Sequence, residues 1–152
     1  MKKIMILVGI LLVSCQNKNT SVTEDLKLEF EKVAKEFQQN YIEGSDHCKY
    51  FIRSIDKDVQ ISEIDFGQPK VLISYEQLAE FCPQLSKKIV VDMTSEQRLL
   101  TPSLGYDYVR MTYLRESHGD TVQRISSRIW KVNKGTWKII QIDNSLSKVC
   151  DD

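Results

Sequence analysis

Residues 106–144 read YDYVRMTYLRESHGDTVQRISSRIWKVNKGTWKIIQIDN, and this stretch decides the fold. It is rich in Val, Ile, Tyr, Thr and Trp, the residue types that favour β-strands. Its turn sequences, His118-Gly119-Asp120 and Asn133-Lys134-Gly135, are short enough to close hairpins. The pattern, extended upstream, predicts long antiparallel strands over 88–100, 106–116, 121–132 and 136–144.

The residues ahead of these strands predict helices. A long amphipathic helix is expected from a capping-box pair, Ser21 and Glu24, to Gly44, with an apolar stripe at Leu26, Phe30, Val33, Phe37 and Tyr41. A short helix capped by Ser45, a strand over 58–64 and a third helix over 75–82, capped by Ser74, follow. Helices ahead of a strand meander predict an α+β fold, with the helices packed on one face of a curved sheet.

Composition excludes several classes of protein. The chain has 152 residues, about one domain, and 41% of them are hydrophobic, enough to bury a core. Its 21 basic and 21 acidic residues balance, whereas a nucleic-acid-binding surface needs a basic excess. No metal-ligand spacing and no phosphate-binding glycine loop occurs, and His47 and His118 lie far apart in the sequence. We therefore expect no nucleic-acid partner, no metal and no cofactor.

The N-terminus has the pattern of an export signal. Lys2 and Lys3 precede an apolar run over 4–13, which is too short to span a bilayer. The ending Leu12-Val13-Ser14-Cys15 resembles the lipobox of bacterial lipoproteins. That resemblance implies cleavage before Cys15 and a lipid on its sulfur, which would anchor the protein to a membrane. The alternative is an ordinary signal peptide with a chance cysteine.

These features divide the chain into three parts. We expect a lipoprotein signal peptide over 1–14, the lipidated cysteine and a polar tether over 15–21, and one folded domain over 22–152. Gln16, rather than Asp, follows the cysteine, which resembles the default signal for the outer membrane of double-membraned bacteria. The expected location is therefore the bacterial cell envelope, at the outer membrane.

The order of elements and three local sequences resemble a known superfamily. They are Tyr108-Val109-Arg110-Met111-Thr112, Ser127-Arg128-Ile129-Trp130 and Gly135-Thr136-Trp137. They are similar to the nuclear transport factor 2-like (SnoaL-like) superfamily, and most of all to the association domain of calcium/calmodulin-dependent protein kinase II. The resemblance implies a cystatin-like, cone-shaped sheet around a pocket. Two histidines of that association domain are replaced here by Gln141 and Asp143, so chemistry that depends on them is not carried over.

Strand alternation suggests a ligand pocket. Tyr108 and Arg110 share one face of their strand, and Arg124, Ser126, Arg128 and Trp130 share one face of the next. If both faces line the concave side, Arg110 and Arg128 converge between Tyr108 and Trp130 and would bind a small carboxylate. Internal ion pairs of these arginines with Glu43, Glu63 or Asp143 explain the same pattern, and this interpretation is preferred.

The resemblance also suggests a second use of the cone. Relatives similar to ketosteroid isomerase and polyketide cyclases use a carboxylate or a histidine inside it. Asp143 occupies such a position here and is the weak catalytic candidate, with Asp65 and Asp46 as lesser alternatives. Gln141 and Asp143 are also expected among the ligand-binding residues of the pocket. An ion pair of Asp143 with an arginine is favoured over a base, which argues against an enzyme.

Two further expectations concern assembly. An apolar stripe of Val109, Met111, Tyr113, Ile125 and Ile129 is expected opposite the arginines, as the face through which a homodimer forms. Of the cysteines left after lipidation, Cys82 and Cys150 are the preferred disulfide pair, whereas Cys48 is expected in the core.

Three functions remain open at this point. The first is a lipid-anchored binding or assembly domain of the cell envelope with a pocket for a small anion. The second is an isomerase, cyclase or dehydratase with a pocket carboxylate as base. The third is a structural lipoprotein that dimerises through its sheet.

Overall fold

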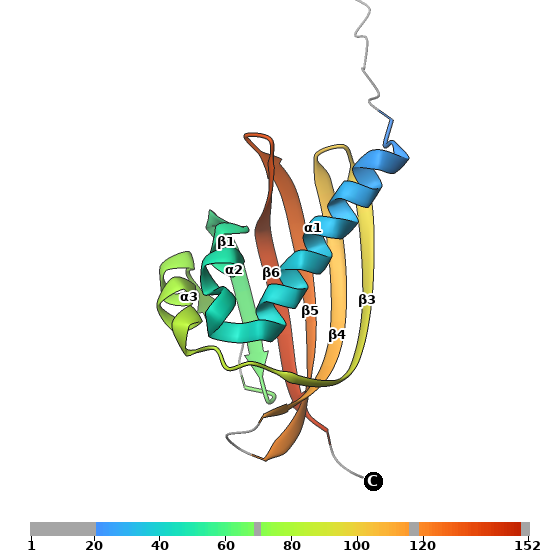
Figure 1. Cartoon of the computed structure of the whole chain (residues 1–152). Coiled ribbons are helices and arrows are strands. Elements are labelled where there is room, and N and C mark those ends of the chain that lie inside the picture. Colours follow the sequence, from blue (N-terminus) through green and yellow to red (C-terminus); the bar gives the residue numbers. More distant parts are fainter. Residues whose placement is uncertain (1–20, 69–70, 116–118, 150–152) are drawn as a thin grey trace, which may run out of the picture.

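Six strands form one curved sheet against which the helices pack. The computed structural model describes residues 21–68, 71–115 and 119–149 (Figure 1). The spatial order is β2-β1-β6-β5-β4-β3. The strands are β1 (Ile55–Asp65), β2 (Val71–Ile73), β3 (Ile89–Thr101), β4 (Leu104–Arg115), β5 (Asp120–Asn133) and β6 (Thr136–Lys148). The predicted α+β fold with N-terminal helices on a curved sheet is confirmed.

The meander β3-β4-β5-β6 is antiparallel throughout, as the hairpin sequences predict. β1 joins it differently, because it pairs in parallel with β6, Ile61 standing beside Ile142. β2 is an additional edge strand that the sequence pattern did not predict. With only three residues it is too short to show alternation, and it pairs Ile73 with Ile61.

The N-cap of helix α1 (Glu24–Glu43) is Thr23, two residues after the expected cap. The side chain of Thr23, not Ser21, accepts the hydrogen bond from the Leu26 amide, at 3.4 Å. Gly44 ends the helix at φ 78°, in the left-handed region that favours glycine. A short 3-10 turn, η1 (Gly44–His47), then precedes α2 (Cys48–Arg53), where the sequence suggested a direct cap by Ser45.

Helix α3 (Tyr75–Phe81) has the expected cap. Ser74 accepts from the Gln77 amide while the Gln77 side chain accepts from the Ser74 amide, which is a complete capping box. The 3-10 turn η2 (Cys82–Gln84) carries Pro83 and ends the helix. None of the helices within the described residues is long and apolar enough to cross a membrane.

The core lies between the helices and one face of the sheet, which we call the inner face. Its centre is aromatic: Phe30 and Phe37 of α1 each pack on Trp130 in a T-shaped arrangement, with ring centroids 6.1 and 5.5 Å from that of Trp130. Phe30 also packs on Gly105, where an added Cβ would lie 2.5 Å from its ring. The opposite, outer face is not covered by any helix of the described chain (Figure 1).

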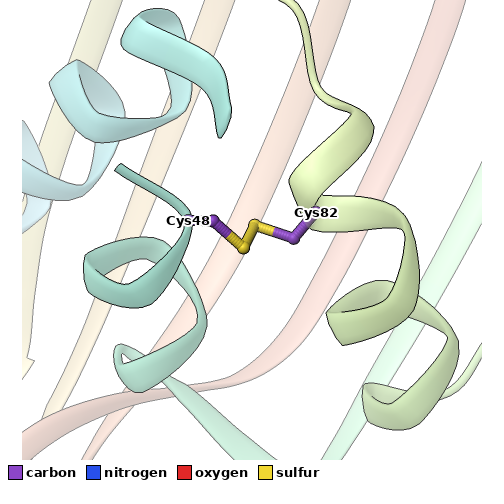
Figure 2. The surroundings of a disulfide bond; sticks show 2 residues. All are labelled: Cys48 and Cys82. Atoms are coloured by element: carbon purple, nitrogen blue, oxygen red, sulfur yellow. A yellow bond between two sulfur atoms is a disulfide. The ribbon is translucent and has the colours of Figure 1, made fainter. Parts of the chain in front are cut away.

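A disulfide joins Cys48, at the start of α2, to Cys82, at the end of α3 (Figure 2). The expected partner of Cys82, Cys150, lies outside the described residues, and Cys48 is not an unpaired core residue. The prediction is wrong because the 3-10 turns η1 and η2 lie against each other and bring the two Cα atoms to 5.6 Å. Sequence spacing does not reveal that contact.

We expect the disulfide to make a large contribution to stability. It closes a loop across a sequence separation of 34 residues, so the Cys48→Ser/Cys82→Ser variant should lose about 3 to 4 kcal/mol of unfolding free energy. Urea unfolding with and without reductant measures this. Reductant should shift the wild-type midpoint to that of the variant and leave the variant unchanged; an equal midpoint for both oxidised proteins would contradict the prediction.

Candidate functional site

A cavity of about 220 Å³ lies between the inner face of the sheet and the helices. Most of its wall is apolar, contributed by all three α-helices and by the sheet: Phe37, Phe51, Leu78, Val109, Met111 and Ile142. Such a concave, mainly apolar site with a few polar groups is typical of small-molecule binding.

The polar part of the wall is a connected network on the sheet. Arg124 Nη2 donates to Glu63 Oε2 at 3.2 Å, and Asn144 Nδ2 donates to the same oxygen at 3.2 Å. The Ser126 hydroxyl donates to Asn144 Oδ1 at 2.8 Å. These groups come from β1, β5 and β6, and strand alternation turns them all to the inner face. The network fixes their orientation before any ligand enters.

A buried ion pair adjoins this network. The guanidinium of Arg128 donates to both carboxylate oxygens of Asp107, at 2.7 and 2.8 Å, and to Gln38 Oε1 at 3.0 Å. Exposures of 3% for Arg128 and 0% for Asp107 remove both charges from water. Burial raises the pKa of the Asp107 carboxyl, and the bidentate guanidinium opposes that shift. The Arg128 guanidinium also lies 4.8 Å from the Phe37 ring centroid.

Each of the two arginines in the cavity wall has a carboxylate partner. Arg124 has Glu63 as its partner and Arg128 has Asp107, so neither guanidinium is left over to attract an anion. Tyr41, which also lines the cavity, lies 5.0 Å below the Arg124 guanidinium. Burial raises the pKa of the Tyr41 phenol from its ordinary 10.0 to about 12, so the phenol stays neutral even in moderately alkaline solution.

A buried lysine lies behind Tyr41. Lys88 is 8% exposed, and its Nζ donates to the carbonyl oxygens of Tyr41 and Ser86 at 3.2 and 3.3 Å. Nζ also lies 4.0 Å from the Tyr41 ring centroid. Burial and, to a smaller extent, the nearby Arg124 charge lower the pKa of Lys88 to about 8. This ammonium is therefore held by carbonyl and aromatic groups.

The expected convergence of Arg110 and Arg128 is wrong. Arg110 stands beside Ile125 in the β4–β5 register, whereas Arg128 stands beside Asp107. Arg110 is exposed on the outer face, and Tyr108 lies on that face too. Alternation divided the side chains of each strand correctly between two faces. The β4–β5 register, however, places the odd-numbered residues of β4 on the same face as the even-numbered residues of β5, so Arg110 and Arg128 lie on opposite faces. The preferred ion-pair interpretation holds for Arg128, with Asp107 as the partner rather than Glu43, Glu63 or Asp143.

The remaining candidates also lie outside the cavity. Asp143 and Gln141 are on the outer face, where Asp143 accepts hydrogen bonds from Ser62 and from Gln141. Trp130 is on the inner face as expected but is fully buried in the core, away from the cavity wall. Asp65 is exposed, and the side chain of Asp46 lies outside the described part. Of the predicted ligand-binding residues, only Arg128 lines this cavity.

The predicted apolar subunit stripe is wrong in its composition for the same reason. Val109, Met111 and Tyr113 face the core and are buried, whereas Ile125 and Ile129 are on the outer face. Dimerisation itself stays a prediction.

Several residues of the cavity were not singled out from the sequence as a site. Gln38 is one residue past Phe37 and four past Ala34, so it continues the apolar stripe of the helix with a polar side chain. That interruption of the stripe was an available signal. Glu63 was named only as an ion-pair partner, and Asn144 had no local signal. Within the described residues, no group of three or more potential metal-binding side chains occurs.

No protein-family model matches the sequence, and no curated protein does either. Among solved structures, the chain is similar to an NTF2-like protein of unknown function from Shewanella baltica OS155 (TM-score 0.60, 8% identity, 83% of this chain and 98% of that one). It is also similar to a ketosteroid isomerase-like protein from Erwinia carotovora atroseptica SCRI1043 (TM-score 0.58, 14% identity, 85% and 100%). A further similar structure is an NTF2-like protein of unknown function from Silicibacter pomeroyi DSS-3 (TM-score 0.56, 10% identity, 78% and 97%). These similarities confirm the nuclear transport factor 2-like fold; the closer resemblance to the kinase association domain stays a prediction.

The buried lysine predicts a specific pH dependence. Folded Lys88 loses its proton near pH 8, while the unfolded chain keeps it up to its ordinary pKa of 10.5. In that window the unfolded state binds more protons, so the free energy of unfolding should rise with pH, by up to roughly 2 kcal/mol between about pH 8 and pH 10. Tyr41 opposes this only above its ordinary pKa of 10.0.

Urea unfolding across this range is the measurement. Lys88→Met should remove the rise, whereas Lys87→Met, at an exposed lysine that pairs with Glu43, should keep it. A wild-type profile as flat as that of Lys88→Met would contradict the prediction.

Proposed function

We propose that this chain is a lipid-anchored domain of the cell envelope that binds a small, largely apolar molecule in the cavity between its helices and its sheet. The observation that supports binding is the cavity itself, about 220 Å³ of space with an apolar wall and a preorganised polar network. A core filled only for stability would be packed without such a void.

The geometry favours a different class of ligand from the one that the sequence suggested. A small carboxylate was expected because two arginines would converge without partners. Arg110 lies on the outer face, and the two cavity arginines already have carboxylate partners. A second anion would have to compete with Glu63 or Asp107 inside a region of low dielectric, which is unfavourable. A neutral ligand avoids that competition.

Catalysis is less well supported than binding. One similar solved structure is a hexachlorocyclohexane dehydrochlorinase (TM-score 0.52, 7% identity), which shows that the fold accommodates an enzyme. The carboxylate that lines this cavity is Glu63, and its Oε2 already accepts from Arg124 and from Asn144. The catalytic candidate Asp143 lies on the other face. A binding role therefore fits the arrangement better.

Filling the cavity tests the proposal. Val109 is 2% exposed and lines the cavity, so Val109→Phe should weaken binding of the neutral fluorescent probe N-phenyl-1-naphthylamine by about tenfold or more. The matched control is Val91→Phe on β3, where the side chain is 67% exposed. Ile142→Phe serves as a second cavity variant if Val109→Phe does not fold. Probe affinity that is the same in all folded variants would overturn the proposal.

The anchor is tested separately, because Cys15 lies outside the described residues. In a bacterial host, the mature chain is expected to begin at Cys15, to carry the mass of attached lipid and to sediment with the outer membrane. Cys15→Ser should release the protein into the soluble fraction. Mass spectrometry of the purified N-terminus decides the question, since a mature chain without added lipid mass would contradict anchoring.

A further inference from the structure

We infer that Gln38 selects, within the proposed ligand cavity, a neutral ligand that carries a carbonyl oxygen. This inference rests on the proposed function and adds the chemical class of the ligand and the residue that recognises it. Gln38 is the one primary amide that α1 contributes to the cavity wall.

The orientation of the Gln38 amide is fixed by the buried ion pair. Arg128 Nη1 donates to Gln38 Oε1 at 3.0 Å, while Nε and Nη2 of the same guanidinium are held by Asp107. A flipped amide would turn its NH₂ group toward a guanidinium that can only donate. The amide oxygen therefore faces Arg128, and the amide nitrogen must point the other way.

The amide nitrogen lacks a strong acceptor in the described part of the chain. Its partner is the thioether sulfur of Met111, 3.8 Å away, and a thioether is a weak acceptor. Gln38 is 6% exposed, so bulk water reaches it poorly. A buried donor without a good acceptor costs free energy, which an incoming acceptor recovers. Gln38 and Met111 both line the cavity, so a ligand can supply that acceptor.

The chemistry of the surroundings limits what the acceptor is. Apart from the polar network on the sheet and Arg128, the cavity wall is mainly apolar and includes Phe37, Val109 and Met111. The charges are already balanced by the pairs Arg124–Glu63 and Arg128–Asp107. An uncharged carbonyl oxygen on an apolar body meets both conditions: it accepts from Nε2 and adds no charge to the site.

Three compounds of equal heavy-atom count test this chemistry on the whole protein. Acetophenone carries a carbonyl, α-methylstyrene replaces its oxygen by a methylene group, and benzoate carries a charge. Displacement of N-phenyl-1-naphthylamine gives each affinity. We expect acetophenone to bind about tenfold more tightly than α-methylstyrene, as one recovered hydrogen bond implies, and benzoate to bind no better than α-methylstyrene.

Variants then assign the preference to one side chain. Gln38→Met keeps the size of the side chain and should reduce the preference for acetophenone to about one. Gln38→Glu keeps an acceptor for Arg128 but removes the N–H donors, and should do the same if Gln38→Met is unstable. The matched control is Gln39→Leu, at the exposed neighbouring glutamine that donates to Glu43, where the tenfold preference should remain.

The outcomes separate the inference from the proposed function. Equal affinity for acetophenone and α-methylstyrene in the wild type, or a preference that survives in folded Gln38→Met, would overturn the inference while cavity binding stands. Tightest binding of benzoate would also overturn it, because it would require an unpaired cation in the site. A probe that Val109→Phe does not affect would remove the proposed function itself.

Discussion

The ion pair between Arg128 and Asp107 is the interaction on which the interior of this protein depends. It links β4 to β5 with two charge-assisted hydrogen bonds and reaches α1 through Gln38. Either charge left alone at this depth would be strongly destabilising. The pair therefore requires one register between the two strands and one position of the helix above them. This fixed arrangement of strands and helix determines the geometry of the cavity wall.

The element types of this fold were predictable, because each depends on local patterns. The apolar stripe of α1, the Ser74 cap of α3 and the strand-forming composition of β3 to β6 are properties of neighbouring residues. The inward face of β5, with Arg124, Ser126, Arg128 and Trp130, also followed from simple alternation. The parallel pairing of β1 with β6 and the short strand β2 did not, since both depend on contacts between distant segments.

The candidate site was harder to predict, and the reason is register. Alternation assigns each side chain to one of two faces of its own strand, but it does not say which faces of two strands coincide. Asp107, rather than Arg110, therefore shares a face with Arg128. The disulfide was unpredictable for a similar reason, because Cys48 and Cys82 meet through the packing of η1 and α2 on η2, which lie far apart in the sequence. The sequence shows Gln38 as a polar residue within the apolar stripe of α1. The orientation of its amide, however, depends on Arg128, which the strand register places beside Asp107.

The parallel pairing of β1 with β6 has a consequence for how this polypeptide acquires its structure. On one side residues 61–63 pair with the short strand β2, and on the other side residues 60–65 find their neighbours at 141–146 of β6, about 80 residues further along the chain. Contacts of such long sequence separation form late, because the intervening chain must first be ordered. During synthesis the meander hairpins have local partners, whereas β1 and β2 join the larger sheet only when β6 has emerged. The sheet of the nascent chain thus lacks its β1–β2 edge until residues 141–146 have been synthesised.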